Sequence, residues 1–189
     1  YRRTHRKLKS NQNCKGRHLV QAVWYEQIGA ADVVLTHGNI DDPKVSDGEV
    51  LVRLRTSGVN PSDVKTRAGA RGELQFPRII PHSDGAGNIE AVGNGVDTNR
   101  IGERVWVWNG AFGRAFGTCA EYISLPANQA VEMPENSTFE AGACMGIPAS
   151  TAYHGVFSGG SVKNKTLLVT GGAGAVGHYA IQLAKWDGA

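Results

Sequence analysis

A glycine-rich turn near the end of the chain carries the clearest chemical signal in the sequence. Residues 172–177 read Gly-Ala-Gly-Ala-Val-Gly. In such a turn the first glycine permits a tight bend, the second lets the backbone approach a pyrophosphate, and the third allows close packing of the helix. The free N–H groups at the start of that helix, with the positive end of its dipole, then face phosphate oxygens. The pattern predicts a dinucleotide site made of Gly172, Ala173, Gly174, Ala175, Val176 and Gly177.

The elements on either side of the turn decide how specific this signal is. The run Thr166–Thr170 shows little alternation, which is typical of a strand buried on both faces of a parallel sheet. Residues 176–186 place apolar side chains at helical spacing. The dinucleotide motif requires a strand before it and a helix after it, whereas a purely structural turn would hold no ligand. The residue that distinguishes NAD from NADP normally lies about 20 positions beyond the glycines, which is past Ala189.

The residues before Pro148 predict short strands separated by Gly, Pro and Asn. In residues 49–56, the apolar side chains of Val50 and Val52 alternate with arginines, which is the period of a half-buried strand. Further strands are expected at residues 22–26, 87–93, 104–108 and 119–125, at a spacing that suits a small barrel. A helix is expected over residues 149–156, with Pro148 in its first turn. The fold class is therefore α/β with a β-rich N-terminal part.

The bulk composition is that of a globular protein, with 41% hydrophobic and 20% charged residues. The apolar runs are too short for a transmembrane helix.

Of the 20 Lys and Arg residues, seven lie within residues 1–19, which leaves 13 basic against 17 acidic residues in the rest of the chain. We expect this basic segment to be a disordered, solvated extension, and the first residue, Tyr1, indicates that the chain does not start at its natural N-terminus. Three widely spaced cysteines without a CxxC pair favour a reducing compartment, and we expect a cytoplasmic protein.

Several motifs resemble the medium-chain dehydrogenase/reductase superfamily, specifically its zinc-free quinone oxidoreductase branch, the zeta-crystallin-like proteins. They are Ser57-Gly-Val-Asn-Pro-Ser-Asp63, Ile80-Pro-His-Ser-Asp-Gly-Ala-Gly87, Val92-Gly-Asn-Gly-Val96, Gly102-Glu-Arg-Val105, Ala120-Glu-Tyr122, Gly146-Ile-Pro-Ala-Ser-Thr-Ala-Tyr153 and the glycine turn. The resemblance implies a GroES-like catalytic barrel at residues 20–147, after the extension at 1–19. Residues 148–189 would be the first βα unit of an incomplete Rossmann domain. Because family members are much longer, we expect a C-terminally truncated fragment.

The same resemblance bears on zinc. Zinc-dependent dehydrogenases of the superfamily hold a catalytic zinc through a Cys after the Gly-Val motif and a His in a Gly-His-Glu motif. In this chain Asn60 occupies the first region and Ser83 the second, and His82 is out of register. We expect His82 to be a turn or surface residue, and Cys119 and Cys144 to pack in the interior. No metal site is expected.

The resemblance also implies the mechanism and the remaining site residues. NADPH would supply hydride or electrons to a flat electrophile that the protein positions. Asn60 would either polarise a substrate carbonyl or hydrogen-bond the local backbone as a turn residue. Lys65 stands where relatives place an aromatic cofactor contact, and a lysine there would meet phosphate. Thr151 and Tyr153, at the domain junction, would contact the nicotinamide end or simply pack, and Asp84 is expected to be structural.

Three functional hypotheses follow. The first is an NADPH-dependent quinone oxidoreductase that acts on a quinone or enone without metal; the nearest alternative is a 2-enoyl thioester reductase of the same superfamily. The second is an RNA-binding zeta-crystallin-like protein, which the basic residues 1–19 support only by charge, because they lack interleaved aromatic residues. The third is an inactive fragment, because a one-strand Rossmann sheet leaves both edges open. We expect no membrane partner, and the complete family protein would form homo-oligomers.

Overall fold

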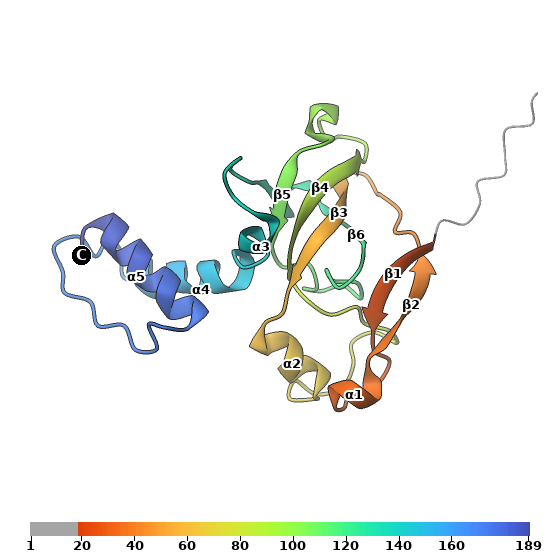
Figure 1. Ribbon diagram of the computed structural model, residues 1–189, viewed down its shortest axis with the longest axis horizontal. Helices are drawn as coiled ribbons and strands as arrows, with labels where there is room; N and C mark the ends of the chain where they lie inside the picture. Colours follow the sequence, from red (N-terminus) through yellow and green to blue (C-terminus); the bar gives the residue numbers. More distant parts are fainter. Residues whose placement is uncertain (1–18) are drawn as a thin grey trace, which may run out of the picture.

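The computed structural model describes residues 19–189 (Figure 1). The basic extension expected at residues 1–19 therefore lies outside the described residues, apart from Leu19. The strands are β1 (Leu19–Trp24), β2 (Thr36–Asp41), β3 (Glu49–Gly58), β4 (Asp84–Val92), β5 (Arg104–Val107), β6 (Tyr122–Pro126) and β7 (Ala130–Glu132). The helices are α1 (Ala31–Val34), α2 (Pro61–Arg67), α3 (Phe139–Gly142), α4 (Gly146–Phe157) and α5 (Ala175–Asp187), with short 3-10 helices at Thr98–Arg100 and Ala127–Gln129.

Five strands form one antiparallel sheet in the order β6-β3-β4-β5-β7, and β1 and β2 form a separate antiparallel pair. The two sheets are joined where the Val23 amide donates to the Cys119 carbonyl at 2.9 Å, next to a bridge between Ala22 and Ala120. Residues 119–121, expected to be part of a strand that reaches 125, make this junction instead, and β6 begins only at Tyr122. The other strands expected before Pro148 are confirmed, with ends that differ by a few residues.

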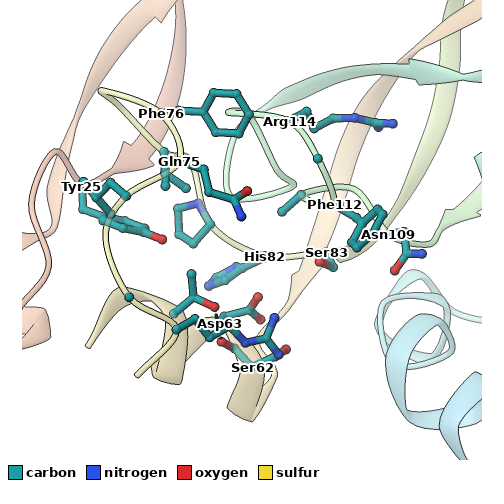
Figure 2. Close-up of a pocket in the computed structure, with 18 of the residues that line it drawn as sticks. Tyr25, Ser62, Asp63, Gln75, Phe76, His82, Ser83, Asn109, Phe112 and Arg114 are labelled. Carbon is teal, nitrogen blue, oxygen red and sulfur yellow. Dashed lines mark hydrogen bonds between the residues drawn. The ribbon is translucent and has the colours of Figure 1, made fainter. Parts of the chain in front are cut away.

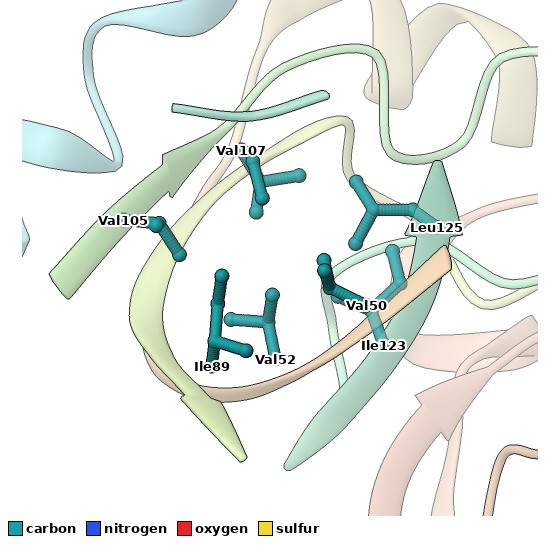
Figure 3. Close-up of a cluster of buried hydrophobic side chains, with 8 residues drawn as sticks. Val50, Val52, Ile89, Val105, Val107, Ile123 and Leu125 are labelled. Carbon is teal, nitrogen blue, oxygen red and sulfur yellow. The ribbon is translucent and has the colours of Figure 1, made fainter. Parts of the chain in front are cut away.

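The core lies inside the curved five-stranded sheet. Side chains from β3, β4, β5 and β6 point into one common interior (Figure 3). The buried residues are Val50, Val52, Ile89, Val105, Val107, Ile123, Leu125 and Ala130. Burying one such Val, Ile or Leu side chain is worth about 1.5–3 kcal/mol. The alternation predicted for β3 is confirmed, since Val50 and Val52 are fully buried while Arg53 and Arg55 are exposed.

Two helices follow the sheet and lie to one side of it, beyond α3 (Figure 1). The helices expected at residues 149–156 and 176–186 are confirmed as α4 and α5, which have 12 and 13 residues. They pack against each other through small side chains, with Ala152 and Val156 of α4 against Ala180 and Ala184 of α5. No helix within residues 19–189 is both long enough and apolar enough to cross a bilayer.

The strand expected at Thr166–Thr170 is not formed, and this prediction is wrong. No β-ladder includes these residues, and the side chain of Leu168 is 90% exposed. A parallel strand takes its backbone hydrogen bonds from neighbouring strands. None of the strands in the described part of the chain lies beside this segment, so the backbone has no ladder to join.

Candidate functional site

A cavity of about 600 Å³ opens between α2, the loop of residues 71–83 and the loop of residues 109–114 (Figure 2). Its apolar lining comes from Tyr25, Leu74, Phe76, Ile79, Phe112 and Ile147, and its polar lining includes Ser62, Asp63, Gln75, His82, Ser83 and Asn109. Because Ile147 belongs to α4, the cavity lies where the β-rich part meets the two C-terminal helices. Its size and its mainly apolar walls with a few polar groups are typical of a small-molecule site, for which about 300–1,000 Å³ is usual.

His82 lies near the centre of this cavity wall, next to Ser83 (Figure 2). Its backbone has φ 76°, and its carbonyl accepts a hydrogen bond from the Thr118 amide at 2.9 Å. Its Nδ1 lies 2.9 Å from the hydroxyl oxygen of Ser57. Burial lowers the pKa of His82, which favours the neutral ring. The expectation of a turn residue is confirmed, but His82 is half-buried in a cavity wall rather than on the surface.

Asp63 is the acidic residue that α2 contributes to the cavity. It occupies the third position of that helix, where its Oδ2 accepts from the Asn60 backbone N–H at 2.7 Å. Burial raises the pKa of Asp63, and the Asn60 hydrogen bond and the positive charge of Arg71 oppose that rise. Tyr25 faces the same space, and its pKa is raised by burial and then by the Asp63 charge. With Glu73, the cavity therefore holds two carboxyl groups, one phenol and one neutral imidazole, besides the guanidinium groups of Arg71 and Arg114.

Asn60 and Asp84 form a buried connection behind the cavity. The Asn60 amide Nδ2 donates to Asp84 Oδ2 at 2.8 Å. The Ile147 N–H donates to both oxygens of Asp84, at 3.0 and 2.9 Å. Asp84 is fully buried, and burial raises its pKa against the opposing effect of these hydrogen bonds. Its carboxyl group lies at the start of α4, where the helix dipole favours negative charge, so the expected structural role of Asp84 is confirmed.

The other residues singled out by resemblance lie outside the cavity lining. Lys65 is exposed on α2, and Asn60 is buried but does not line the cavity. Thr151 is exposed on α4, and the half-exposed Tyr153 packs on Phe157 with 4.9 Å between ring centroids. The structure thus brings none of these four to the cavity.

The aromatic lining was missed by the sequence reasoning. Tyr25, Phe76 and Phe112 come from three separate segments. No local spacing links them: Phe76 and Phe112 lie in loops, whereas Tyr25 directly follows β1, within the strand expected at residues 22–26. The sequence therefore carries no signal that joins these three side chains.

The glycine turn opens α5, although the strand that the dinucleotide motif requires before it is not formed. Gly171 has φ 69°, and the Gly174 amide donates to its carbonyl at 2.9 Å. A Cβ at Gly177 would lie 2.2 Å from the Gly171 carbonyl oxygen, so only glycine fits there. The first N–H groups of α5, from Ala175 onward, lack acceptors within the helix. These features fit a bound pyrophosphate.

Within residues 19–189, no cluster of three His, Cys, Asp or Glu side chains is arranged to hold a metal ion.

Cys119 is half-buried, as expected, and burial raises the pKa of its thiol. Cys144 is exposed, so the expectation that it packs in the interior is wrong. The turn between α3 and α4, in which the Cys144 amide donates to the Ala141 carbonyl, directs this side chain outward.

Comparison with known proteins adds the evolutionary relationship. Residues 46–135 match the family model described as "Alcohol dehydrogenase GroES-like domain". Quinone oxidoreductase of Homo sapiens is 33% identical over 171 residues, which cover 90% of this chain and 51% of that protein. The 2-methylene-furan-3-one reductase of Solanum lycopersicum is 32% identical over 166 residues, covering 85% of this chain and 43% of that protein. The chain belongs to the medium-chain dehydrogenase/reductase superfamily.

Solved structures of this superfamily agree with the fold described above. An alcohol dehydrogenase superfamily protein from Novosphingobium aromaticivorans superposes with a TM-score of 0.80 at 32% identity, over 90% of this chain and 51% of that one. A mycobacterial protein complexed with NADPH superposes with a TM-score of 0.74 at 30% identity, over 89% and 50%. The chain spans about half the length of the curated relatives it matches. The expected superfamily and the GroES-like, β-rich fold are confirmed.

Proposed function

We propose that the protein containing this chain is an NADPH-dependent quinone oxidoreductase of the zinc-free, zeta-crystallin-like branch. The observation that supports it best is the turn of residues 171–177, in which a Cβ at Gly177 would clash with the Gly171 carbonyl and α5 begins directly at the turn. Such a turn holds the pyrophosphate of a dinucleotide. Quinone oxidoreductases among the relatives support the reaction.

The cofactor contacts in this proposal come from backbone rather than from charged side chains. When bound, NADPH supplies a hydride to the substrate. The N–H groups at the start of α5, within residues 172–177, would hold the pyrophosphate. Thr151 at the nicotinamide end and Lys65 at a phosphate remain proposed contacts. Both side chains are exposed and therefore accessible.

In this proposal the substrate binds in the cavity. A flat quinone ring suits its apolar walls, where Phe76, Phe112 and Ile147 supply contact area. Holding the ring in one orientation lowers the barrier by proximity. Asn60 has one amide hydrogen engaged with Asp84, and within residues 19–189 its amide group donates to no other acceptor. Because Asn60 is buried behind the cavity and does not line it, we assign it a positioning role, in which it holds the Asp84 carboxyl group instead of contacting the substrate.

A reductase of activated carbon–carbon double bonds is the second candidate. A relative named as a 2-methylene-furan-3-one reductase, at 32% identity, supports an enone substrate. A 2-enoyl thioester carries the same kind of activated alkene, conjugated to a thioester carbonyl instead of a ketone, and its thioester group stays intact in the reduction. Reduction of an enone and reduction of a 2-enoyl thioester both deliver hydride to a group conjugated to a carbonyl, and the same kind of cavity could hold either substrate. Assays with each substrate distinguish the two reactions.

The test is cofactor oxidation by the intact protein. NADPH absorbance is followed with an ortho-quinone, a para-quinone, a small enone and a 2-enoyl thioester, each against a no-substrate control. We expect quinone-dependent loss of NADPH absorbance, and weaker loss with NADH. Turnover of the enone or the thioester alone would favour the second candidate. Absence of turnover with all four substrates, in protein that binds NADPH, would refute the proposed class of reaction.

A further inference from the structure

A chain of hydrogen bonds behind the cavity determines which nitrogen of His82 carries a proton. The fully buried Thr118 hydroxyl donates to the Asp84 carbonyl at 2.6 Å. The Ser57 hydroxyl oxygen lies 2.9 Å from the Thr118 oxygen and 2.9 Å from His82 Nδ1. These three contacts, which involve two hydroxyl groups and one imidazole, run in a single line from the β4 backbone to the cavity wall.

Counting the hydrogens leaves one arrangement. Each hydroxyl group has a single hydrogen to donate. Thr118 donates its hydrogen to a carbonyl, so Ser57 must donate to Thr118. Ser57 then has only lone pairs left for His82, so Nδ1 must carry the hydrogen in their contact. The neutral ring is therefore the Nδ1–H form, and its Nε2 has a free lone pair.

The lone pair of Nε2 is available to the cavity. His82 lines the cavity, and within residues 19–189 its side chain makes no hydrogen bond besides the one to Ser57. The backbone adds a second, independent observation. Among the described residues, His82, Asn109 and Asn164 are the non-glycine residues with positive φ, and the first two both line this cavity. Residues held in such conformations cluster at functional sites.

We propose that His82 is the acid–base residue of the cavity, and that its Nε2 exchanges a proton with the oxygen of a hydroxyaryl product. This inference rests on the proposed reductase activity. Delivery of a hydride to one carbonyl oxygen of the quinone would form an O–H bond, reduce the ring by two electrons and leave the negative charge on the other oxygen, giving the hydroquinone monoanion. The negative charge that develops on this monoanion favours protonation of the otherwise neutral His82 at Nε2 by solvent. That Nε2–H bond then breaks, an O–H bond forms on the monoanion, and the neutral Nδ1–H imidazole remains.

The charged and titratable groups around His82 come from every side of the cavity. Asp63 lies on α2, Arg71 and Glu73 lie on the loop before His82, and Tyr25 follows β1. Arg114 lines the far side, where its guanidinium donates to Gln129. Because several of these groups can influence a pH profile, the first measurement has to report on His82 itself.

The first test is the tautomer, measured by long-range ¹H–¹⁵N correlation of the histidine rings in the intact protein. His82→Asn assigns the signals, since asparagine tolerates positive φ. We expect the Nδ1–H pattern for neutral His82. Ser57→Ala should shift it toward the Nε2–H form, while Ser124→Ala, whose hydroxyl bonds Glu49 instead, should leave it unchanged. An Nε2–H pattern in the wild-type protein would overturn the inference.

The second test is ligand binding without cofactor, using hydroquinone and its dimethyl ether as probes. Hydroquinone should shift the ¹H–¹⁵N NMR signals of the His82 ring. It should also bind about tenfold more tightly than the ether, which has no hydroxyl hydrogen to donate. In His82→Gly, which tolerates the positive φ and offers no side-chain acceptor, this difference should disappear. Equal binding of the two probes to wild-type protein would refute the contact.

The two proposals can fail separately. If quinones do not stimulate NADPH oxidation but the tautomer and the probe preference hold, the reductase activity is refuted and the hydroxyl contact of His82 stands. If quinone turnover occurs and His82→Asn changes neither its rate nor its pH profile, the acid–base role is refuted and the reductase activity stands.

Discussion

Two glycines of α4 provide a matched test of how the helix is attached to the sheet. Gly146 is its first residue and Gly155 lies near its end. A Cβ added at Gly155 would meet nothing within 4 Å, whereas one at Gly146 would lie 2.1 Å from Asp84 Oδ1. The same chemical change, glycine to alanine, should therefore have opposite effects on the free energy of unfolding.

The expected magnitudes follow from the local contacts. Gly155→Ala should stabilise by about 0.5–1 kcal/mol, because alanine loses less backbone entropy in a helix. Gly146→Ala must displace the Asp84 carboxyl group, which is fully buried and accepts both contacts from the Ile147 N–H. A buried donor without its acceptor costs about 1–3 kcal/mol, and steric displacement in a packed site costs about the same again. We expect Gly146→Ala to destabilise by about 2–6 kcal/mol.

Urea unfolding of the intact protein measures both variants. A second pair of variants, Asp84→Ala with and without Gly146→Ala, isolates the clash, because removing the carboxyl group removes the atom that the new methyl group would meet. The penalty of Gly146→Ala should then shrink to about 1 kcal/mol or less. If Gly146→Ala is as stable as Gly155→Ala, or if its penalty persists in the Asp84→Ala background, the proposed attachment of α4 through Asp84 is wrong.

The remaining predictions concern the glycine turn and the imidazole. Gly174→Ala places a Cβ 3.4 Å from the Gly171 carbonyl oxygen, so stability should change by less than about 1 kcal/mol while NADPH affinity, measured by calorimetry, falls at least about tenfold. Gly177→Ala, with backbone only 2.2 Å away, should lower the unfolding free energy by about 2 kcal/mol or more; an unchanged urea midpoint would contradict the packing. Burial lowers the pKa of His82 below its usual value of 6.5, so the unfolded chain takes up the proton first as pH falls. The wild-type protein should thus lose stability below about pH 6.5, and His82→Asn should lose less; equal pH slopes would refute this.

The motif at the C-terminal end shows how far sequence reasoning extends. The glycine spacing correctly predicted a turn followed by a helix, because both depend on residues close together in the chain. The strand before the turn was predicted from equally good local features and is absent. A strand exists only when another strand supplies its hydrogen bonds, so local composition at residues 166–170 could not decide it.

His82 and Asp84 also show, at the candidate site, that local sequence does not predict contacts between distant segments. Their neighbourhood in the sequence suggested a turn histidine and a structural carboxyl group, and both interpretations hold in outline. Their partners, Ser57 and Ile147, are 25 and 63 residues away and carry no local signal. The tautomer of His82 and the attachment of α4 follow from those distant partners.

The sequence by itself determined the superfamily, the β-rich fold, the alternation that fills the sheet interior and the glycine turn that opens α5, because periodicity, turn chemistry and motif order are local properties. Only the tertiary structure decided that loops 71–83 and 109–114 enclose a cavity with α2 and α4, and that His82 faces it. It also showed that Asn60, Lys65, Thr151 and Tyr153 lie outside the cavity lining. The physical reason is that a cavity is made by side chains from distant segments, whose meeting depends on the path of the whole chain.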